Sequence, residues 1–268
     1  MVNAFDQKKQ KILSALNVSN DDYTDLSPKG SVDAGIRDLI DEINAVPGLV
    51  TTSSCAGRVS VFLEGKKRSA ALLSQQAPQA AESEKSKESG PTGKGGGRWL
   101  FVSHDPVALS ISKDEESISL LERLGLKQRT GEDVPEGASL VHFKFEPMIL
   151  HIFTASLQEA NKVLSAANAA GFRESGALNL TAAQGATVTP MVAVRSAGLS
   201  FDSIVAFESS DGRVISLVDE GYLKLLLGLS DERFRTNTER IERFRSHLKQ
   251  QWAKEGKGAR EKKVAISS

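Results

Sequence analysis

The feature that most constrains this chain is a fifteen-residue alternation of apolar and polar residues, SLVHFKFEPMILHIF at 139–153. Before Pro147 the apolar positions are Val141, Phe143 and Phe145, and the polar positions between them are His142, Lys144 and Glu146. Successive side chains of a strand point to opposite faces, so this period predicts a long strand with one buried face. A strand of this length needs partners, and the chain must therefore fold around a sheet.

The rest of the chain predicts helices and further strands around this one. Apolar residues at helical spacing predict helices over 4–16, about 32–43, 114–125, 156–170 and much of the last 40 residues. Gly171 is a typical helix stop. Further strands are predicted at 50–63 (two strands joined by a Ser/Gly bend), 99–105, 187–195, 203–207 and 213–218. The predicted fold class is α/β, with a mixed sheet flanked by helices.

Residues 65–98 differ in composition from the rest, being rich in Ser, Gln, Lys, Glu and Gly without an apolar period. Such a segment cannot bury enough apolar surface to offset its ordering entropy, so it predicts a disordered insert. We therefore expect one α/β domain over 1–230, interrupted by this insert, and a basic C-terminal helix and flexible tail over 231–268. Residues 224–263 contain twelve Lys or Arg and six Asp or Glu. This excess favours contact with an RNA backbone, although a solvated helix face would look the same.

Several classes of protein are disfavoured by the sequence. The formal net charge of the 268 residues is zero, so any nucleic-acid surface must come from local clustering. A single cysteine, Cys55, allows no internal disulfide and no cysteine metal cluster, and we expect no metal. No apolar run reaches 18 residues, and the start MVNAFDQKKQ lacks the apolar core of a signal peptide, which favours the cytosol. The dinucleotide fingerprint of Rossmann-like enzymes is missing from the sequence.

Polar residues gather where the predicted strands end. The run TTSSCAGR at 51–58 places hydroxyls, a thiol, a glycine and Arg58 in one predicted bend, which could present backbone N–H groups and the guanidinium to an anion. The run is equally typical of an ordinary turn whose hydroxyls satisfy the local backbone. Cys55 by itself is more typical of a small core residue than of a nucleophile.

Other candidates are single residues, each with a structural alternative. His104 follows the apolar run WLFVS and is either a proton acceptor or a cap. His151 is flanked by two apolar residues, so it is either a base or a buried histidine with a structural role. Lys144 and Glu146 share a strand face, where they bind a ligand or form an ion pair with each other. The remaining cations at such positions are Arg173 and Arg195.

Taken in order, these runs resemble the tRNA wybutosine-synthesizing protein 3 family. The resemblance rests on DLSPKGSVD at 25–33, TTSSCAGR at 51–58, WLFVSHD at 99–105, FKFEPMILHI at 143–152, GFRESG at 171–176, AVRS at 193–196 and RIERFRSHL at 240–248. It covers nearly the whole chain except 65–98 and the last fifteen or so residues. The insert is longer than the family pattern, and GLSFDSIVAF at 198–207 lacks its Val-Pro.

The resemblance implies a methyltransferase without a Rossmann-like core. It would move a methyl group from S-adenosylmethionine to the 4-nitrogen of the imidazopurine base at position 37 of phenylalanine tRNA. The chain would contact the anticodon loop, and other enzymes of the same pathway are candidate partners. Methyl transfer mainly requires alignment of donor and acceptor, together with removal of a proton from the acceptor ring.

The site residues expected from the resemblance form three groups. The catalytic group is His104, His151 and Glu146, and either imidazole is a candidate base because it titrates near neutral pH. The group expected at the methyl donor is Ser53, Ser54, Cys55, Gly57, Arg58 and Ser175. The group expected at the tRNA is Ser27, Lys29, Lys144, Arg173 and Arg195. Two alternatives stay open: an accessory tRNA-binding protein without turnover, and a cysteine hydrolase that uses Cys55 with one of the histidines.

Overall fold

The computed structural model describes residues 4–16, 34–65, 96–107, 119–181 and 188–266. Its internal contacts divide the chain into two units, each treated by itself below. Unit 1 comprises residues 1–58, 146–200 and 233–268, and unit 2 comprises residues 59–145 and 201–232. Three elements contribute to both units: strands β1 (Leu49–Leu63) and β3 (Leu140–Thr154), and helix α5 (Glu220–Ile266).

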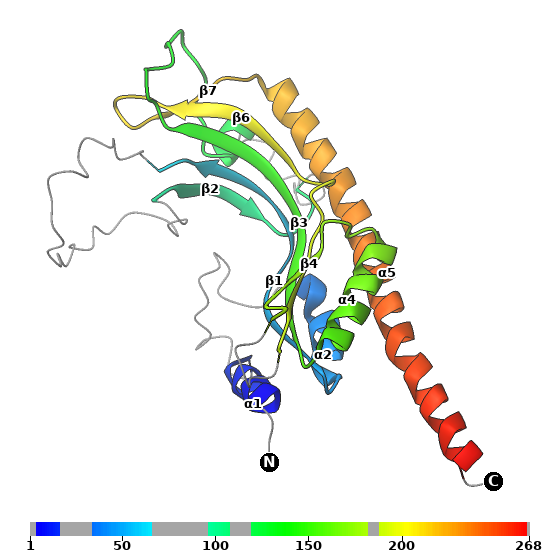
Figure 1. The fold of residues 1–268 in the computed structure, drawn as a ribbon. Helices are drawn as coiled ribbons and strands as arrows, with labels where there is room; N and C mark the ends of the chain where they lie inside the picture. The colour runs from blue at the N-terminus through cyan, green and yellow to red at the C-terminus, as the bar shows by residue number, and fades with distance from the viewer. Residues whose placement is uncertain (1–3, 17–33, 66–95, 108–118, 182–187, 267–268) are drawn as a thin grey trace, which may run out of the picture. The chain divides into compact units, whose positions relative to one another are not determined.

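Unit 1 is a sheet with helices on both faces. Its strands are hydrogen-bonded in the order β1, β3, β5 (Met191–Val194) and β4 (Gly176–Leu178). Helices α2 (Arg37–Ala45), α4 (Leu157–Ala170) and the later part of α5 bury one face, which holds the apolar core of the unit (Figure 1). A 3-10 turn, Ala34–Ile36, leads into α2. Helix α1 (Ala4–Leu16) packs Phe5 on the other face, against Val50 and Phe153.

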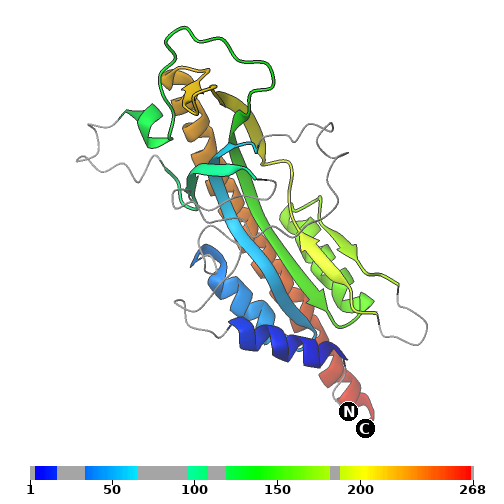
Figure 2. The same cartoon turned by 90° about the vertical axis from the view of Figure 1, so that its left-hand side faces the viewer.

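Unit 2 continues β1 and β3 with other neighbours. Strand β2 (Arg98–Ser103) pairs with β1, β6 (Phe201–Glu208) pairs with β3, and β7 (Val214–Ser216) pairs with β6. Figure 2 shows β1 and β3 running side by side along their length. The short helix α3 (Leu120–Arg123) and the start of α5 complete the unit. Phe143 and Phe145 are fully buried and stack against Phe201.

Most predicted elements are confirmed. The long strand at 139–153 exists as β3, and Val141, Phe143 and Phe145 are fully buried as the alternation predicted. Helix α4 begins at a Ser156 cap and ends at Gly171, whose φ of 97° lies in the left-handed region that glycine favours. The described ladders β1–β2, β3–β5, β3–β6, β4–β5 and β6–β7 are antiparallel, and parallel geometry occurs at an isolated bridge between Lys127 and Ile215.

One prediction is wrong, one is tested only in part, and one strand was not predicted. Residues 50–63 form one continuous strand instead of two strands and a bend; Gly57 takes a φ of 122° inside it. The helix expected at 114–125 is described only as Leu120–Arg123, because 108–118 lie outside the described residues. Strand β4 was not predicted, since three residues carry too little pattern to detect. Most of the predicted insert and all of DLSPKGSVD at 25–33 also lie outside the described residues.

Candidate active site

A histidine and a serine meet on the face of unit 1 opposite α2, α4 and α5. Leu150 and Ile152 point into the core beneath those helices, so the alternation of β3 turns His151 to the other face. The Nδ1 atom of His151 lies 2.9 Å from the Oγ atom of Ser53 on β1. This pair joins two runs that are 98 residues apart in the sequence.

The imidazole of His151 is held in a form suited to accept a proton. Partial burial lowers its pKa most, and the positive charge of Arg195 lowers it further, while a hydrogen bond at Ser53 acts in the opposite direction. A lowered pKa keeps the imidazole neutral at physiological pH. With Nδ1 next to the serine hydroxyl, Nε2 is the atom that a substrate proton would reach.

Arg195 follows strand β5 and is exposed beside this pair. In the β3–β5 ladder His151 is the register partner of Ala193, two residues before Arg195. The Nε atom of Arg195 donates to the carbonyl oxygen of Glu174 at 3.0 Å, and its backbone N–H donates to Ser175 Oγ at 3.1 Å. Ser175 in turn donates to the Phe172 carbonyl at 2.7 Å. The GFRESG loop therefore fixes the backbone of Arg195 and orients its guanidinium.

Arg58 and Glu146 form an ion pair, with Arg58 Nε 2.7 Å from Glu146 Oε2. The idea that Glu146 pairs with Lys144 along the strand is wrong, because Lys144 lies 2.9 Å from Asp202 in unit 2 instead. Neighbours across a ladder are closer than residues two apart on one strand, which favours the cross-strand partners. The Glu146 side chain remains 46% exposed, so this ion pair is open to solvent on the carboxylate side.

Asn237 is a residue of this region that sequence reasoning missed. Its side chain is 2% exposed on α5; its Nδ2 donates to the Ala56 carbonyl at 2.7 Å, and its Oδ1 accepts from the Met148 N–H at 2.9 Å. It therefore fastens β1 to β3 beside Gly57. A side chain on Gly57 would lie 3.0 Å from Asn237 Nδ2 and 3.2 Å from the Glu146 carbonyl. A polar residue within the apolar stripe of α5 was the signal that could have revealed it.

The other predicted site residues are placed as follows. Ser54 and Cys55 are on β1 in unit 1 and are both half-buried, and Arg173 is exposed after α4 in the same unit. His104 lies after β2 in unit 2, where Lys144 also lies. Ser27 and Lys29 lie outside the described residues. The predicted residues of TTSSCAGR, FKFEPMILHI from Glu146 onward, GFRESG and AVRS thus belong to one unit.

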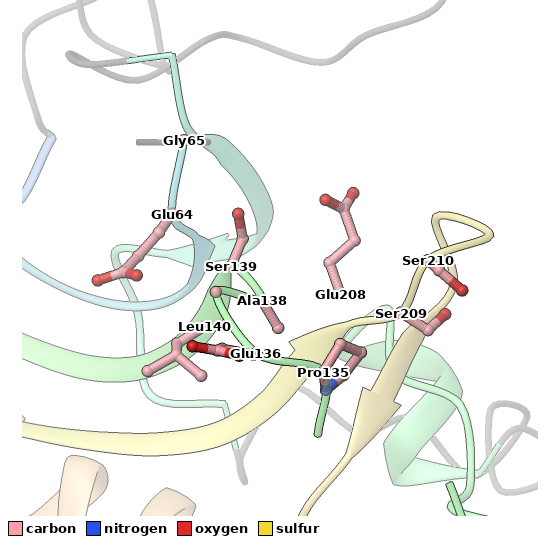
Figure 3. A pocket seen from close by; sticks show the side chains of 11 residues that line it. Glu64, Gly65, Pro135, Glu136, Ala138, Ser139, Leu140, Glu208, Ser209 and Ser210 are labelled. Carbon is pink, nitrogen blue, oxygen red and sulfur yellow. The ribbon is translucent and has the colours of Figure 1, made fainter. Parts of the chain in front are cut away.

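Unit 2 contains a different polar cluster and a pocket. His142 lies between Asp202, at 2.7 Å from Nδ1, and Glu64, at 3.1 Å from Nε2. Glu64 also borders a hollow of about 570 Å³ (Figure 3). The carboxylates among its lining residues are Glu64, Glu136 and Glu208. No predicted site residue is among the described residues that line this pocket, and three carboxylates oppose the binding of an anion there.

A search of the described residues finds no helix long and apolar enough to cross a membrane. The same residues hold no group of three or more His, Cys, Asp or Glu side chains arranged to bind a metal ion.

Comparison with known proteins adds a family match to this geometry. The sequence model of the family described as Methyltransferase TYW3 matches residues 7–250. A tRNA wybutosine-synthesizing protein 3 from Saccharomyces cerevisiae is 34% identical over 246 residues, covering 90% of this chain and 79% of that protein. One from Schizosaccharomyces pombe is 33% identical over 258 residues, covering 96% and 92%. In fold, the chain resembles the PH1069 protein from Pyrococcus horikoshii, with a TM-score of 0.59 at 22% identity over 91% of this chain and 95% of that one.

Proposed function

Because this chain belongs to the Methyltransferase TYW3 family, we propose that it is a tRNA methyltransferase of wybutosine synthesis. Its methyl donor is S-adenosylmethionine, and its acceptor is the 4-nitrogen of the imidazopurine base at position 37 of phenylalanine tRNA. The contact on the tRNA is the anticodon loop, where a bulky base can leave the stack. A cytosolic location belongs to the same proposal. The observation that carries the choice of site is the Ser53–His151 pair beside Arg195.

His151 acts as the general base in this proposal. Bound S-adenosylmethionine supplies a methyl group on a positively charged sulfur, which becomes a neutral thioether. As the nitrogen–methyl bond forms and the sulfur–methyl bond breaks, the acceptor nitrogen loses its proton, and Nε2 of His151 receives it. Ser53 holds Nδ1 and so fixes the ring orientation. The lowered pKa of His151 keeps Nε2 able to accept the proton at neutral pH. His104 remains the second candidate base.

The chemistry of the residues around this pair suits the methyl donor. The donor has a carboxylate, and Arg195 uses its Nε on a backbone carbonyl, so its other N–H groups can pair with a carboxylate. The hydroxyl of Ser53 suits a polar ribose or amino group. Gly57 lets β1 and β3 approach closely beside them. Arg58 on β1 forms an ion pair with Glu146 on β3. In this proposal the ion pair has a positioning role.

The experiment is a methyl-transfer assay with purified protein, S-adenosylmethionine and tRNA that carries the unmethylated tricyclic base. Mass spectrometry of the digested nucleosides should show the gain of one methyl group on that base. Phenylalanine tRNA without the tricyclic base serves as the control and should gain none. Binding of tRNA without any methyl gain and without thermal stabilisation by S-adenosylhomocysteine would instead support the accessory protein.

Cys55→Ser separates the methyltransferase from the cysteine hydrolase. Displacement at a sulfonium needs no covalent intermediate with the enzyme, so this variant should retain methyl transfer. The readout is the methylation rate of the folded variant. Loss of all transfer in a variant with an unchanged melting temperature, or a methyl thioether on Cys55, would overturn the proposed mechanism.

A further inference from the structure

A second polar feature of unit 1 is a hollow of about 480 Å³ where helix α4 ends. Three guanidinium groups line it, from Arg173 in the loop after α4 and from Arg240 and Arg243 on α5. One carboxylate residue, Glu174, is among the described residues that line it. The pocket therefore gathers cations from two segments that are far apart in the sequence.

Two of the three arginines also serve the structure. Arg240 Nη1 donates to Ser196 Oγ at 2.7 Å and to the Gly171 carbonyl at 3.2 Å. Arg243 reaches the Ala170 carbonyl at 3.4 Å. Cations at a helix C-terminus satisfy carbonyls that have no partner within the helix. The capping of α4 thus explains the position of the Arg240 side chain and, in part, that of Arg243.

Capping does not account for Arg173. Its side chain is exposed and forms no hydrogen bond or ion pair with any residue that the structure describes. The lining carboxylate residue, Glu174, accepts a hydrogen bond from the Ala197 N–H at 3.1 Å. Burial lowers the pKa of Arg240, and the positive charges of Arg243, Arg173 and Arg233 lower it further against the attraction of Glu174. Arg243 also lies 3.9 Å from Glu239 outside the lining, so the three guanidiniums still outnumber the two carboxylates near them, Glu174 and Glu239.

We infer that the Arg173–Arg240–Arg243 pocket binds a phosphodiester group of the tRNA backbone. Guanidinium groups match phosphate oxygens in paired hydrogen bonds, and a polar lining suits a phosphate better than a base or an apolar ligand. The pocket is also linked to the candidate active site through one loop. Glu174, next to Arg173, holds Arg195 through its carbonyl oxygen. The identity of the polymer as tRNA rests on the proposed function.

The test measures tRNA binding by the full-length protein at several salt concentrations. The double variant Arg173→Gln/Arg243→Gln removes two pocket charges and leaves Arg240 and its capping bonds in place. We expect the Kd for tRNA to rise about tenfold, because charged hydrogen bonds are lost. The plot of log K against log salt should become shallower by about 0.7 to 0.9 per lost phosphate contact. The affinity for S-adenosylhomocysteine and kcat at saturating tRNA should not change, whereas KM for tRNA should rise.

The matched control is Arg37→Gln/Arg235→Gln, which removes the same charge from residues of unit 1 outside the pocket. An equal loss in both double variants would overturn the inference, because it would show a general charge effect. A loss of S-adenosylhomocysteine binding with an unchanged Kd for tRNA would also overturn it. Arg173→Gln alone removes an exposed side chain that holds no other part of the described fold, and it keeps the test valid if the double variant does not fold.

A further arm separates the RNA backbone from a small anion. Inorganic phosphate is titrated at constant ionic strength, with the melting temperature as the readout. Stabilisation at low millimolar phosphate that disappears in the double variant, with no change in the Kd for tRNA, would contradict an RNA site. Failure of the proposed function can be told apart from failure of this inference. If the wild-type protein binds tRNA without methylating it, the salt dependence of tRNA binding can still be measured.

Discussion

In unit 1, His151 bonds a serine hydroxyl and lies near the positive charge of Arg195, whereas in unit 2, His142 is held between two carboxylates. Both histidines project from β3, and they are nine residues apart. The neighbours of His151 favour a neutral imidazole that can accept a proton. Those of His142 favour a ring whose two nitrogens are both engaged. The same residue type on the same strand is therefore suited to different tasks.

The pockets of the two units show the same contrast. The hollow at the end of α4 in unit 1 is lined by three guanidiniums and one carboxylate, and the hollow beside Glu64 in unit 2 by three carboxylates. Phosphates are attracted to the first and repelled from the second. The net charge of the whole chain is zero and hides this difference. We therefore expect unit 1 to hold the methyl donor and the tRNA, and substitutions in unit 2 to act mainly on stability.

The largest expected effect comes from replacing His151 or His142 by glutamine, one at a time. His151→Gln keeps a polar side chain but removes the base, so kcat should fall by about 100-fold or more. His142→Gln should change kcat by less than about tenfold and instead lower the melting temperature, because it leaves Glu64 and Asp202 without their shared partner. Single-turnover methylation and thermal unfolding are measured for both variants.

His247→Gln, on α5 in unit 1, serves as the control for loss of any histidine in that unit. If His142→Gln abolishes turnover in a folded protein while His151→Gln retains it, the assignment of chemistry to unit 1 fails.

The sequence named candidate site residues, but it could not show how the fold holds them. Alternation placed His151 on a strand, and the family resemblance marked Ser53, but neither could show that a hydroxyl on β1 meets an imidazole 98 residues later. Such pairs depend on strand register, which the hydrophobic pattern alone does not fix. The predicted bend at 51–58 failed because Gly57 breaks the backbone geometry locally while the strand continues.

The second largest effect is expected at Gly57. With φ at 122° an alanine is strained, and its Cβ would meet the buried Asn237 amide and the Glu146 carbonyl. We expect Gly57→Ala to lower the free energy of unfolding by about 2–4 kcal/mol, from backbone strain plus a disturbed buried hydrogen bond. Protection by S-adenosylhomocysteine should weaken as well.

Gly212→Ala in unit 2 separates strain from contact. Gly212 also has a positive φ, of 82°, but a Cβ at this position would have no atom of the described residues within 4 Å. Its loss of stability should be the smaller of the two, and ligand protection should be unchanged. Equal losses of stability, with ligand protection intact in both variants, would show that Asn237 and Gly57 do not support the ligand site.

A third test concerns the charge beside His151. Arg195→Gln removes a positive charge that helps to lower the pKa of His151, so the pKa should rise. A higher pKa means that the imidazole becomes protonated at higher pH, and the acid limb of the kcat profile should move upward in pH. Arg195→Lys keeps the charge and should leave the limb in place. A limb that stays fixed in Arg195→Gln would argue against His151 as the base.

Replacement of Lys144 tests whether the active site is confined to unit 1. The family resemblance predicts that Lys144 contacts the substrate, whereas the structure pairs it with Asp202 within unit 2. If residues of unit 2 act mainly on stability, Lys144→Ala should reduce kcat/KM by less than about tenfold, since a partly exposed ion pair is worth about 1 kcal/mol. Methylation kinetics of Lys144→Ala and Arg58→Ala are compared. A loss as large as that of His151→Gln would extend the active site to Lys144.

The smallest expected effect lies in unit 1, where two cations of α5 are neutralised within the fold. Glu42 on α2 accepts hydrogen bonds from Arg245 at 2.8 Å and Lys249 at 2.9 Å. The bond from Arg245 contributes most to lowering the pKa of Glu42, to about 2. Because the folded pKa lies below the unfolded one, the stabilisation is complete above about pH 4.5 and is lost as the pH falls towards 2.

Glu42→Gln should therefore lower the free energy of unfolding at neutral pH by less than about 1 kcal/mol, since the group is partly exposed. The difference from wild type should shrink as the pH falls through this window, and Asp41→Asn is the control for the loss of one carboxylate from α2. The variant also releases Arg245 and Lys249 from their carboxylate. If the cations of unit 1 attract RNA, tRNA affinity at low salt should rise slightly. Unchanged affinity would restrict the RNA contact to the arginines of the pocket at the end of α4.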